Sequence, residues 1–334
     1  MTPVRARARA NVALAKYWGK RTLELNLPYT GSISVTLAGL ESTVVLRAAA
    51  GDGDTVIFDA GTAGGTPKVA SPSEVAKVSR FLDLVRDRAA ARTPFAVEIG
   101  TNFPAAAGLA SSASTYAALA LAATRAFDLE LTDAELSALA RRGSGSASRS
   151  LQGGFVEWLP GSAADGRDSH GVQLASEDHW PIGIVVAVTE EAPKKVSSRD
   201  GMQLVAERSP FFPAWLETHA ADADAIRRGI ADRDLALVGE TAEHNCLKMH
   251  AACLAARPPL LYWSPATLAV LLRVQAMRAD GVPAYFTIDA GPQVKVLCRV
   301  EDRAAVAEQL ALVPGVRRVL LSAPGPGAEV LSPL

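Results

Sequence analysis

The sequence has few cysteines, no surplus of positive charge and no long apolar run, and each absence excludes a class of protein. Its 334 residues include three cysteines, Cys246, Cys253 and Cys298, which are too few and odd in number for a disulfide framework, so we expect a reducing, cytoplasmic environment. Lys plus Arg number 34 and Asp plus Glu number 35, which gives a net charge of −1. Because binding to nucleic acid needs a surplus of basic residues, no nucleic-acid partner is expected.

Two segments could be mistaken for membrane or targeting elements. Residues 99–124 carry no charge, but they are mostly Ala, Gly, Ser and Thr, and Pro104 and Gly108 interrupt them. A spanning helix needs about 20 predominantly apolar residues, so we interpret this segment as a loop and a buried helix and expect no membrane partner. The first ten residues alternate Arg and Ala, which is typical of a strand, and Lys16 and Lys20 interrupt the apolar stretch that follows, which argues against a signal peptide.

The length and the hydrophobic pattern predict two domains of the α+β class, which we place at residues 1–180 and 181–334. In the first half, strands are predicted at 4–9, 11–16, 32–37, 43–47, 55–58, 95–99 and 155–159, and helices at 73–91, 111–127 and 132–142. Ser71 or Ser73 is expected to cap the first helix, and Thr132 with Glu135 forms a capping box for the third. A polar stretch at 161–171 is expected to be a surface loop near the domain boundary.

The second half predicts a ferredoxin-like domain. Strands are expected at 182–188, 284–288, 295–300 and 317–321, and helices at 199–207, 211–228, 232–256, 264–280 and 302–312. With the consecutive helices counted as one block, the order is β-α-β-β-α-β, which is the split pattern of that fold.

A loop of small residues, 104–110, precedes the predicted helix that begins at Ser111 and Ser112. Small residues let the backbone approach an anion, the serines add hydroxyl donors, and the helix directs its free N–H groups and positive dipole end to the same place. The segment therefore indicates a phosphate site. A tight turn before an Ala-rich core helix is the equally weighted alternative.

Three further segments carry basic residues beside hydroxyl or aromatic groups. They are residues 11–21, 142–150 and 194–201. Each has a simpler interpretation: a solvated strand end, a flexible surface turn, and ordinary N-capping by Ser197 or Ser198. If the segments converge, they form a strongly cationic pocket suited to a polyphosphate, with Lys16, Lys20, Arg149, Lys194, Lys195 and Arg199.

Asp289 ends an apolar strand and is followed by Ala-Gly-Pro, so it is either a general base or positioning group, or an ordinary turn residue. The helix at 232–256 contains His244, Cys246, His250 and Cys253. Ligands on one straight helix cannot close a tetrahedral zinc site alone. We therefore expect a core helix in which Leu247, Cys253 and Leu254 are buried.

At this point the residues resemble a known family. Pro104 to Ala113 is similar to the phosphate loop of the GHMP kinase superfamily. Within it, the diphosphomevalonate decarboxylase family is matched by residues 11–20, 32–37, 102–113, 143–154, 196–202 and 289–292. The Lys-Tyr-Trp-Gly-Lys and Asp-Ala-Gly-Pro segments separate this family from its kinase relatives.

The resemblance implies a ribosomal-protein-S5-like α/β domain followed by a ferredoxin-like α+β domain, with the active site in the cleft between them. It also implies ATP- and Mg²⁺-dependent decarboxylation of mevalonate 5-diphosphate to isopentenyl diphosphate, through phosphorylation of the 3-hydroxyl and then elimination. A homodimer is expected.

The resemblance also implies residue roles. Arg149 would hold the carboxylate that leaves as CO₂, Asp289 would act on the 3-hydroxyl as base or orienting acceptor, and Lys16 would place Asp289 and the transferred phosphoryl group. Residues expected to hold the substrate diphosphate are Tyr17, Lys20, Ser146, Ser198 and Arg199. Residues expected to hold ATP are Pro104, Ala107, Gly108, Leu109, Ala110, Ser111 and Ser112, with Ser111 also at the metal.

The sequence departs from the family pattern in places. Thr30-Gly31 replaces a polar pair, Gln293 replaces an Asn, and the longer C-terminal region of eukaryotic members is missing, so a bacterial-type enzyme is expected. The alternatives are a phosphomevalonate decarboxylase or mevalonate 3-kinase on the same fold, or a non-catalytic phosphometabolite sensor.

Overall fold

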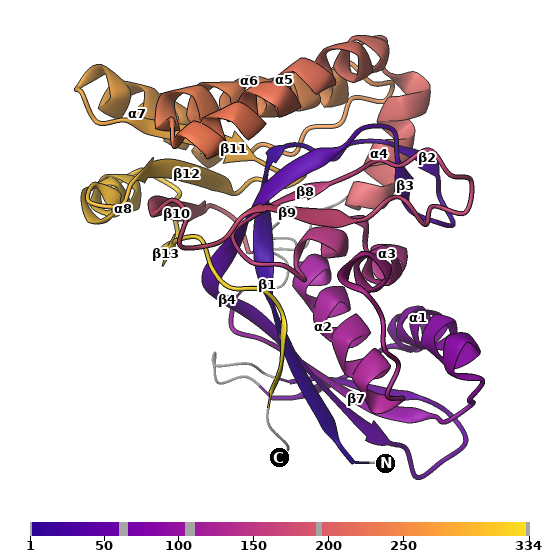
Figure 1. Cartoon of the computed structure of the whole chain (residues 1–334). Helices are drawn as coiled ribbons and strands as arrows, with labels where there is room; N and C mark the ends of the chain where they lie inside the picture. Colours follow the sequence, from indigo (N-terminus) through magenta and orange to yellow (C-terminus); the bar gives the residue numbers. More distant parts are fainter. Residues whose placement is uncertain (1, 60–65, 104–110, 192–195, 332–334) are drawn as a thin grey trace.

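The computed structural model describes residues 2–59, 66–103, 111–191 and 196–331. They form two main β-sheets, each covered on one face by helices and packed against the other (Figure 1), and a small two-stranded sheet. The architecture is of the α+β class, as predicted.

The larger sheet has eight strands, ordered β14-β1-β4-β7-β5-β6, with β8 beside β4 and β9 beside β8. The strands are β1 (Val4–Ala15), β4 (Ser32–Ala48), β5 (Thr55–Phe58), β6 (Lys68–Val69), β7 (Phe95–Thr101), β8 (Phe155–Trp158), β9 (Gly171–Ala175) and β14 (Glu329–Leu331). A separate two-stranded sheet joins β2 (Lys20–Thr22) and β3 (Leu27–Pro28). Sequence reasoning missed β2, β3, β6, β9 and β14.

Two long strands replace four predicted short ones. The pairing of β1 with β4 jumps from Arg9–Glu41 to Asn11–Thr36, and Gly39 in this interval has a φ of +76°. This bulge breaks the residue alternation without ending either strand, which explains why the sequence pattern suggested separate strands.

Three helices cover one face of the larger sheet: α1 (Pro72–Ala89), α2 (Ser111–Ala126) and α3 (Asp133–Gly143). The predicted capping box of Thr132 with Glu135 begins α3, and Ser71, one of the two predicted caps, begins α1, where it forms a capping box with Glu74. A short 3₁₀ helix, η2 (Gly145–Arg149), follows α3 directly. The stretch at 161–171 contains turns, as expected, although Ser169 within it is fully buried.

The smaller sheet has the order β11-β12-β10-β13, and all its neighbouring strands are antiparallel. Its strands are β10 (Ile182–Val188), β11 (Ala284–Ile288), β12 (Val294–Arg299) and β13 (Arg318–Ser322). The helices of this half are α4 (Ser198–Arg208), α5 (Phe212–Asp232), α6 (Leu235–Leu254), α7 (Pro265–Ala279) and α8 (Arg303–Ala311). This strand order confirms the predicted ferredoxin-like arrangement.

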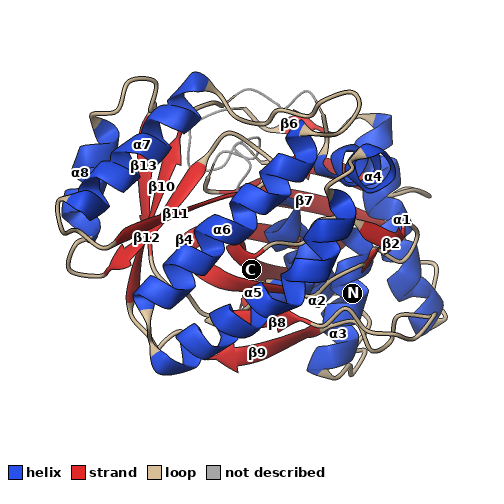
Figure 2. Ribbon diagram, turned by 90° about the horizontal axis from the view of Figure 1, so that it is seen from above, coloured by secondary structure: helices blue, strands red, loops and turns tan. Residues whose placement is uncertain are grey.

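Helices α7 and α8 pack on one face of the smaller sheet, and α5 and α6 lie side by side in Figure 2. The opposite face of the smaller sheet shares a hydrophobic core with β1 and β4, in which Ile184 and Val186 meet Val12 and Val35. After β13 the chain returns to the larger sheet, where β14 pairs with β1. The two sheets are therefore held together by the hydrophobic core between them and by the C-terminal segment, which runs from β13 in the smaller sheet to β14 in the larger one.

Candidate active site

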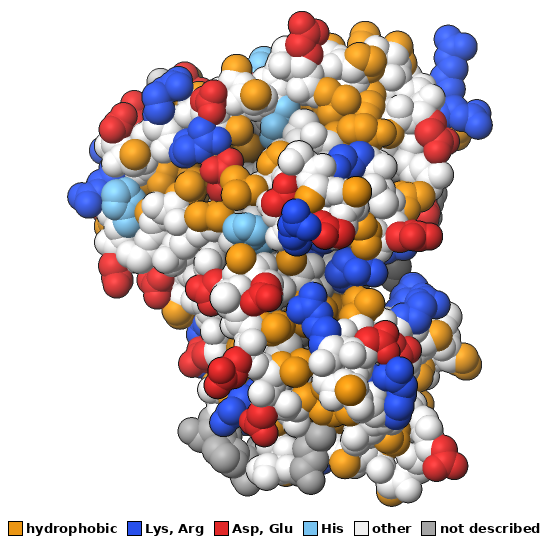
Figure 3. Space-filling view, turned by 45° about the vertical axis from the view of Figure 1, so that its right-hand side comes forward, with side chains coloured by type: hydrophobic (Ala, Val, Ile, Leu, Met, Phe, Trp, Pro, Cys, Tyr) orange, Lys and Arg blue, Asp and Glu red, His pale blue; other side chains and the backbone are white. Residues whose placement is uncertain are grey.

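A cavity of about 1170 Å³ lies where elements of the two sheets meet. Its described lining includes seven basic side chains, Lys16, Lys20, Lys77, Arg80, Arg142, Arg149 and Arg199, and four acidic ones, Glu24, Asp83, Asp200 and Asp289. Figure 3 shows Lys and Arg side chains gathered around the hollow between the upper and lower parts of the molecule. The predicted convergence of basic segments therefore holds for the described residues, whereas Lys194 and Lys195 lie outside them.

Asp289 follows β11 and is held between two buried lysines. Lys16 Nζ donates to Asp289 Oδ1 at 2.7 Å, and Lys295 Nζ donates to Oδ2 at 2.8 Å. Burial alone would raise the pKa of Asp289, but the two ammonium groups outweigh it and hold this pKa well below its usual range. Asp289 is therefore an ionised acceptor and a weak base in this arrangement.

Lys16 is fixed through its backbone as well as its side chain. Its ammonium also donates to Ala13 O at 2.8 Å, and its backbone N–H donates to Asn245 Oδ1 at 2.8 Å. Burial lowers the pKa of Lys16, and the charge of Asp289 opposes that change. The end of β1 is thus anchored to α6 at the point where the chain enters the cavity.

Arg149 is the last residue of η2 and is 2% exposed. The alternative interpretation of this segment as a flexible surface turn is therefore wrong for Arg149. Its Nε donates to Ser34 Oγ at 3.0 Å and its Nη2 donates to Asn11 Oδ1 at 3.2 Å. Nη1 is buried without a partner in the described structure. Burial lowers the pKa of Arg149 to about 10, so this guanidinium lacks a full counter-charge and suits an incoming carboxylate.

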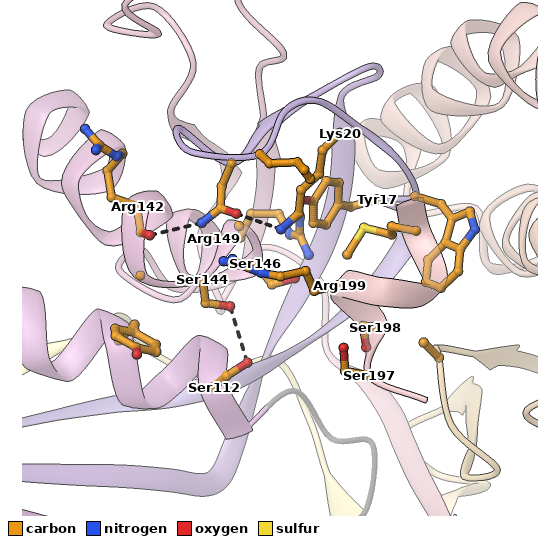
Figure 4. A pocket seen from close by; sticks show the side chains of 18 of the residues that line it. Tyr17, Lys20, Ser112, Arg142, Ser144, Ser146, Arg149, Ser197, Ser198 and Arg199 are labelled. Carbon is orange, nitrogen blue, oxygen red and sulfur yellow. Dashed lines mark hydrogen bonds between the residues drawn. The ribbon is translucent and has the colours of Figure 1, made fainter. Parts of the chain in front are cut away.

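Tyr17, Lys20, Ser146 and Arg149 lie together on one wall of the cavity, and Ser198 and Arg199 approach them from the start of α4 (Figure 4). Lys20 donates to Asn26 Oδ1 at 2.6 Å. Burial, together with the charge of Arg199, lowers the pKa of Lys20 to about 8. The Tyr17 hydroxyl is buried without a partner in the described structure, and burial raises its pKa.

This wall requires glycine at position 145. A Cβ at Gly145 would lie 2.8 Å from the Tyr17 ring and 2.9 Å from the Trp158 ring. Gly145 therefore lets η2 pack directly against Tyr17 and Trp158, and the Trp158 ring in turn contacts both Tyr17 and Arg149.

Helix α2 begins at Ser111, and both Ser111 and Ser112 line the cavity. Ser112 Oγ lies 3.3 Å from Ser144 Oγ. The predicted helix N-terminus therefore faces the same cavity as the basic wall. The other residues proposed for ATP, Pro104, Ala107, Gly108, Leu109 and Ala110, lie outside the described residues.

Sequence reasoning missed the contribution of α1. Lys77, Arg80 and Leu84 line the cavity from one face of this helix. Burial raises the pKa of Tyr116 on α2, and the positive charges of Arg80 and Arg199 oppose that rise. Basic side chains of α1 and α4 therefore both lie near the Tyr116 ring. The spacing of 77, 80 and 84 places these residues on one helical face, but nothing local showed that the face meets a cavity.

Sequence reasoning also missed Lys295, although its position in the sequence indicated a buried charge. It is a lysine within the apolar strand Val294–Arg299, six positions after the acid that it contacts. A lysine at such a position rarely becomes buried without a counter-charge. Gln293, the departure from the family pattern, is buried outside the cavity lining and accepts from Thr189 N at 2.6 Å.

The cysteine- and histidine-bearing helix belongs to the core, as expected. Burial lowers the pKa of His250 to about 3 and raises that of Cys246 to about 11, and no metal-binding group of His, Cys, Asp or Glu occurs among the described residues. The prediction was wrong for Leu247 and Leu254, which are 39% and 45% exposed because they lie on the outer face of α6. Cys253 is buried, as predicted.

Two family models match the chain. The diphosphomevalonate decarboxylase-like N-terminal domain matches residues 8–171, and the mevalonate 5-diphosphate decarboxylase C-terminal domain matches residues 184–318. The chain belongs to the diphosphomevalonate decarboxylase family. A relative named diphosphomevalonate decarboxylase from Candida albicans is 32% identical over 354 residues, which cover 97% of each chain.

Solved structures of the family agree in fold. Mevalonate diphosphate decarboxylase from Staphylococcus aureus has a TM-score of 0.91 at 37% identity, covering 99% of this chain and 98% of that one. A structure described as MDDEF in complex with MVAPP, AMPPCP and magnesium has a TM-score of 0.90 at 37% identity, covering 99% of both chains. In the described part of this family member, none of the helices is long and apolar enough to span a membrane.

Proposed function

We propose that the protein catalyses the ATP-dependent decarboxylation of mevalonate 5-diphosphate to isopentenyl diphosphate, ADP, phosphate and CO₂. The observation that carries this proposal is the pairing of two groups in one cationic cavity: a buried arginine with an unpartnered N–H and a carboxylate fixed by two lysines. The first suits a carboxylate substrate, and the second suits a hydroxyl that must be oriented. Family membership and the relative that binds MVAPP with a nucleotide analogue support the proposal.

Different residues bind different groups of the substrate. Arg149 binds the carboxylate. Its Nη1 has no partner in the described structure and can therefore donate to a carboxylate oxygen, as one of the two parallel bonds that a guanidinium forms with such a group. The diphosphate is bound by Tyr17, Lys20, Ser146, Ser198 and Arg199, whose hydroxyl and cationic groups line the adjacent wall. This division places the 3-hydroxyl next to Asp289.

The chemistry needs orientation more than a strong base. Phosphoryl transfer to the 3-oxygen passes through a loose transition state, so the hydroxyl proton leaves late. Asp289 accepts the hydrogen bond of this hydroxyl and keeps its oxygen directed at the γ-phosphoryl group of ATP. As the new O–P bond forms, the bond from that phosphorus to ADP breaks and the hydroxyl proton passes to Asp289, while Lys16 offsets the charge that develops there. The C3–O bond then breaks as the C1–C2 bond electrons form the C2=C3 double bond, which releases phosphate and CO₂.

ATP fits the cavity at the start of α2. The helix N-terminus and the hydroxyls of Ser111 and Ser112 suit nucleotide phosphates, with the bases of α1 opposite. No acidic cluster for a metal occurs among the described residues, so Mg²⁺ would be held largely by phosphate oxygens, with Ser111 as a protein ligand. When bound, Mg²⁺ neutralises charge on the transferred phosphoryl group.

The deciding experiment offers ATP and Mg²⁺ with mevalonate, its 5-phosphate or its 5-diphosphate in separate assays. We expect equal amounts of ADP and CO₂ from the 5-diphosphate alone. CO₂ from the 5-phosphate would identify a phosphomevalonate decarboxylase, ADP without CO₂ from mevalonate would identify a 3-kinase, and absence of turnover would favour a sensor.

We also propose a cytoplasmic homodimer, with the domains divided at residues 180 and 181. The three cysteines are free and buried, which suits a reducing compartment. Helices α6 and α7 and their connection present five exposed leucines, Leu247, Leu254, Leu261, Leu268 and Leu272.

A second copy of the chain is the occupant that we propose for this leucine face. The exposed positions of α7 from Pro265 to Ala279 are all uncharged, so the face offers no charge for a polar partner, and it can pair with itself about a two-fold axis. Light scattering should give the dimer mass for the wild type and the monomer mass for Leu268→Glu. A monomeric wild type would refute the assembly.

A further inference from the structure

Lys295 is a buried titratable group beside Asp289 for which the proposed reaction gives no role. Its side chain is 1% exposed, and that of Lys16 is 2% exposed, yet both contact the one carboxylate of Asp289. One lysine would neutralise one aspartate. The second makes the trio net positive, and burying an extra charge costs stability unless it serves another purpose.

The geometry shows what a second lysine adds. Lys16 follows β1 and Lys295 lies in β12, so the two ammonium groups reach different oxygens of Asp289 from different elements. A carboxylate held by one bond can turn about its Cβ–Cγ bond, whereas one held at both oxygens keeps its plane. The side chain of Asp289 remains 23% exposed and lines the cavity, so its other lone pairs stay available there.

We propose that Lys295 is a positioning residue for the reaction: it fixes Oδ2 of Asp289, so that the carboxylate stays anionic and keeps one orientation toward the substrate hydroxyl. This inference rests on the proposed function. It assigns the two lysines different tasks, because Lys16 lines the cavity and can meet the transferred phosphoryl group, whereas Lys295 is outside the described lining and would act on the substrate through Asp289.

The test compares Lys295→Met with wild type. Methionine keeps the length of the side chain without its charge, and the Lys16–Asp289 pair remains. Removing a charge-assisted hydrogen bond should lower kcat about 10- to 100-fold, with the KM for ATP changed little. The acid limb of the kcat profile should move up by about 1–3 pH units, because Asp289 keeps its burial but loses one of its two cations.

The other described titratable groups around Asp289 do not produce this limb. Arg149 and Cys246 have pKa values of about 10 and about 11, burial lowers the pKa of His250 to about 3, and Lys16 remains in every variant. Arg227→Met is the matched control, because it removes a cation paired with Glu157 at 2.9 Å outside the cavity lining. This control should leave the kcat profile unmoved.

Lys295→Arg is the second variant, because it retains the charge and should retain the wild-type acid limb even if its size lowers kcat. A Lys295→Met profile that superimposes on wild type would overturn the proposal. So would a lower melting temperature and lower kcat with an unmoved limb, which would show a structural role only. The wild type is assayed on each phosphorylated mevalonate first, and the variants are compared on the substrate it turns over, so an error in the proposed substrate is distinguished from an error about Lys295.

Discussion

Replacing Arg149 by Met should abolish turnover while leaving the ligand-free protein about as stable as wild type. Burial lowers the pKa of Arg149 from 12.5 to about 10, and at about 1.36 kcal/mol per pKa unit this burial costs about 3 kcal/mol. The substitution removes that cost. It also removes bonds to Ser34 and Asn11, worth about 1 kcal/mol each, and the contact of the guanidinium with the Trp158 ring at 5.8 Å, worth about 0.5–1 kcal/mol.

These contributions nearly cancel, so the free energy of unfolding should change by at most about 1 kcal/mol. Asn11 lines the cavity, where water can replace the lost donor. With an unfolding entropy of about 2.1 cal/mol/K per residue, the expected change in Tm is within about 1–2 °C.

Arg141 is the matched control, because it is also 2% exposed and burial also lowers its pKa to about 10. Its donors, however, meet the backbone carbonyls of Leu25 at 3.0 Å and Gly166 at 2.7 Å, and also that of Ser169. Arg141 is outside the cavity lining, so Arg141→Met leaves the buried carbonyls of Gly166 and Ser169 without their donor. The expected loss is about 3 kcal/mol, or about 4 °C in Tm.

The assay is thermal unfolding of wild type, Arg149→Met and Arg141→Met with and without mevalonate 5-diphosphate, together with turnover. The substrate should raise the Tm of wild type and of Arg141→Met, and much less that of Arg149→Met. A ligand-free Arg149→Met that melts more than about 4 °C below wild type would show that Arg149 is structural. An undiminished substrate effect in this variant would show that the arginine does not contact the substrate.

Three other changes test the remaining walls of the cavity. Asp289→Asn should retain substrate binding by calorimetry but lower kcat by about 10²–10⁴-fold, and a kcat within threefold of wild type would exclude Asp289 from the chemistry. Because Lys20 has a pKa of about 8 and loses its charge above it, the wild-type KM for the diphosphate substrate should rise as pH increases through 8. Lys20→Arg should remove this rise, whereas a flat wild-type KM up to pH 9.5 would contradict the assignment. Ser111→Ala should raise the KM for ATP about tenfold without changing Tm, and unaltered ATP kinetics would reject its phosphate contact.

The sequence predicted best what is decided locally. The N-cap at Ser71 and the capping box at Thr132 appear where expected because a cap depends on residues three positions apart. The ferredoxin-like half also followed from its element order. In contrast, β14 was missed because three residues form a strand only by pairing with β1, more than 300 positions away. The single strand β4 was predicted as two strands, 32–37 and 43–47, because the bulge between them depends on the pairing with β1.

The same distinction applies to the site. Arg149, Asp289 and Lys16 were proposed because each lies in a segment that resembles the family, and the structure brings them to one cavity. Lys295 and the basic face of α1 were not proposed, because their importance comes from tertiary contacts: β12 carries Lys295 to an acid after β11, and α1 packs beside α2. Periodicity reveals which face of an element is polar, but it does not reveal what that face meets.

The charges of the cavity supply a physical reason for a diphosphate substrate. The described lining has an excess of three positive charges, and burial lowers the pKa values of Lys20 and Arg149. Outside the cavity, the carboxylates of Glu157 and Asp224 instead raise the pKa of Arg227. The ligand-free cavity therefore carries cations without sufficient counter-charge, and anionic substrates relieve that cost when they bind. A 5-phosphate in place of the 5-diphosphate would leave Lys20 or Arg199 without a partner from the substrate, and for this reason we expect the protein to discriminate against it.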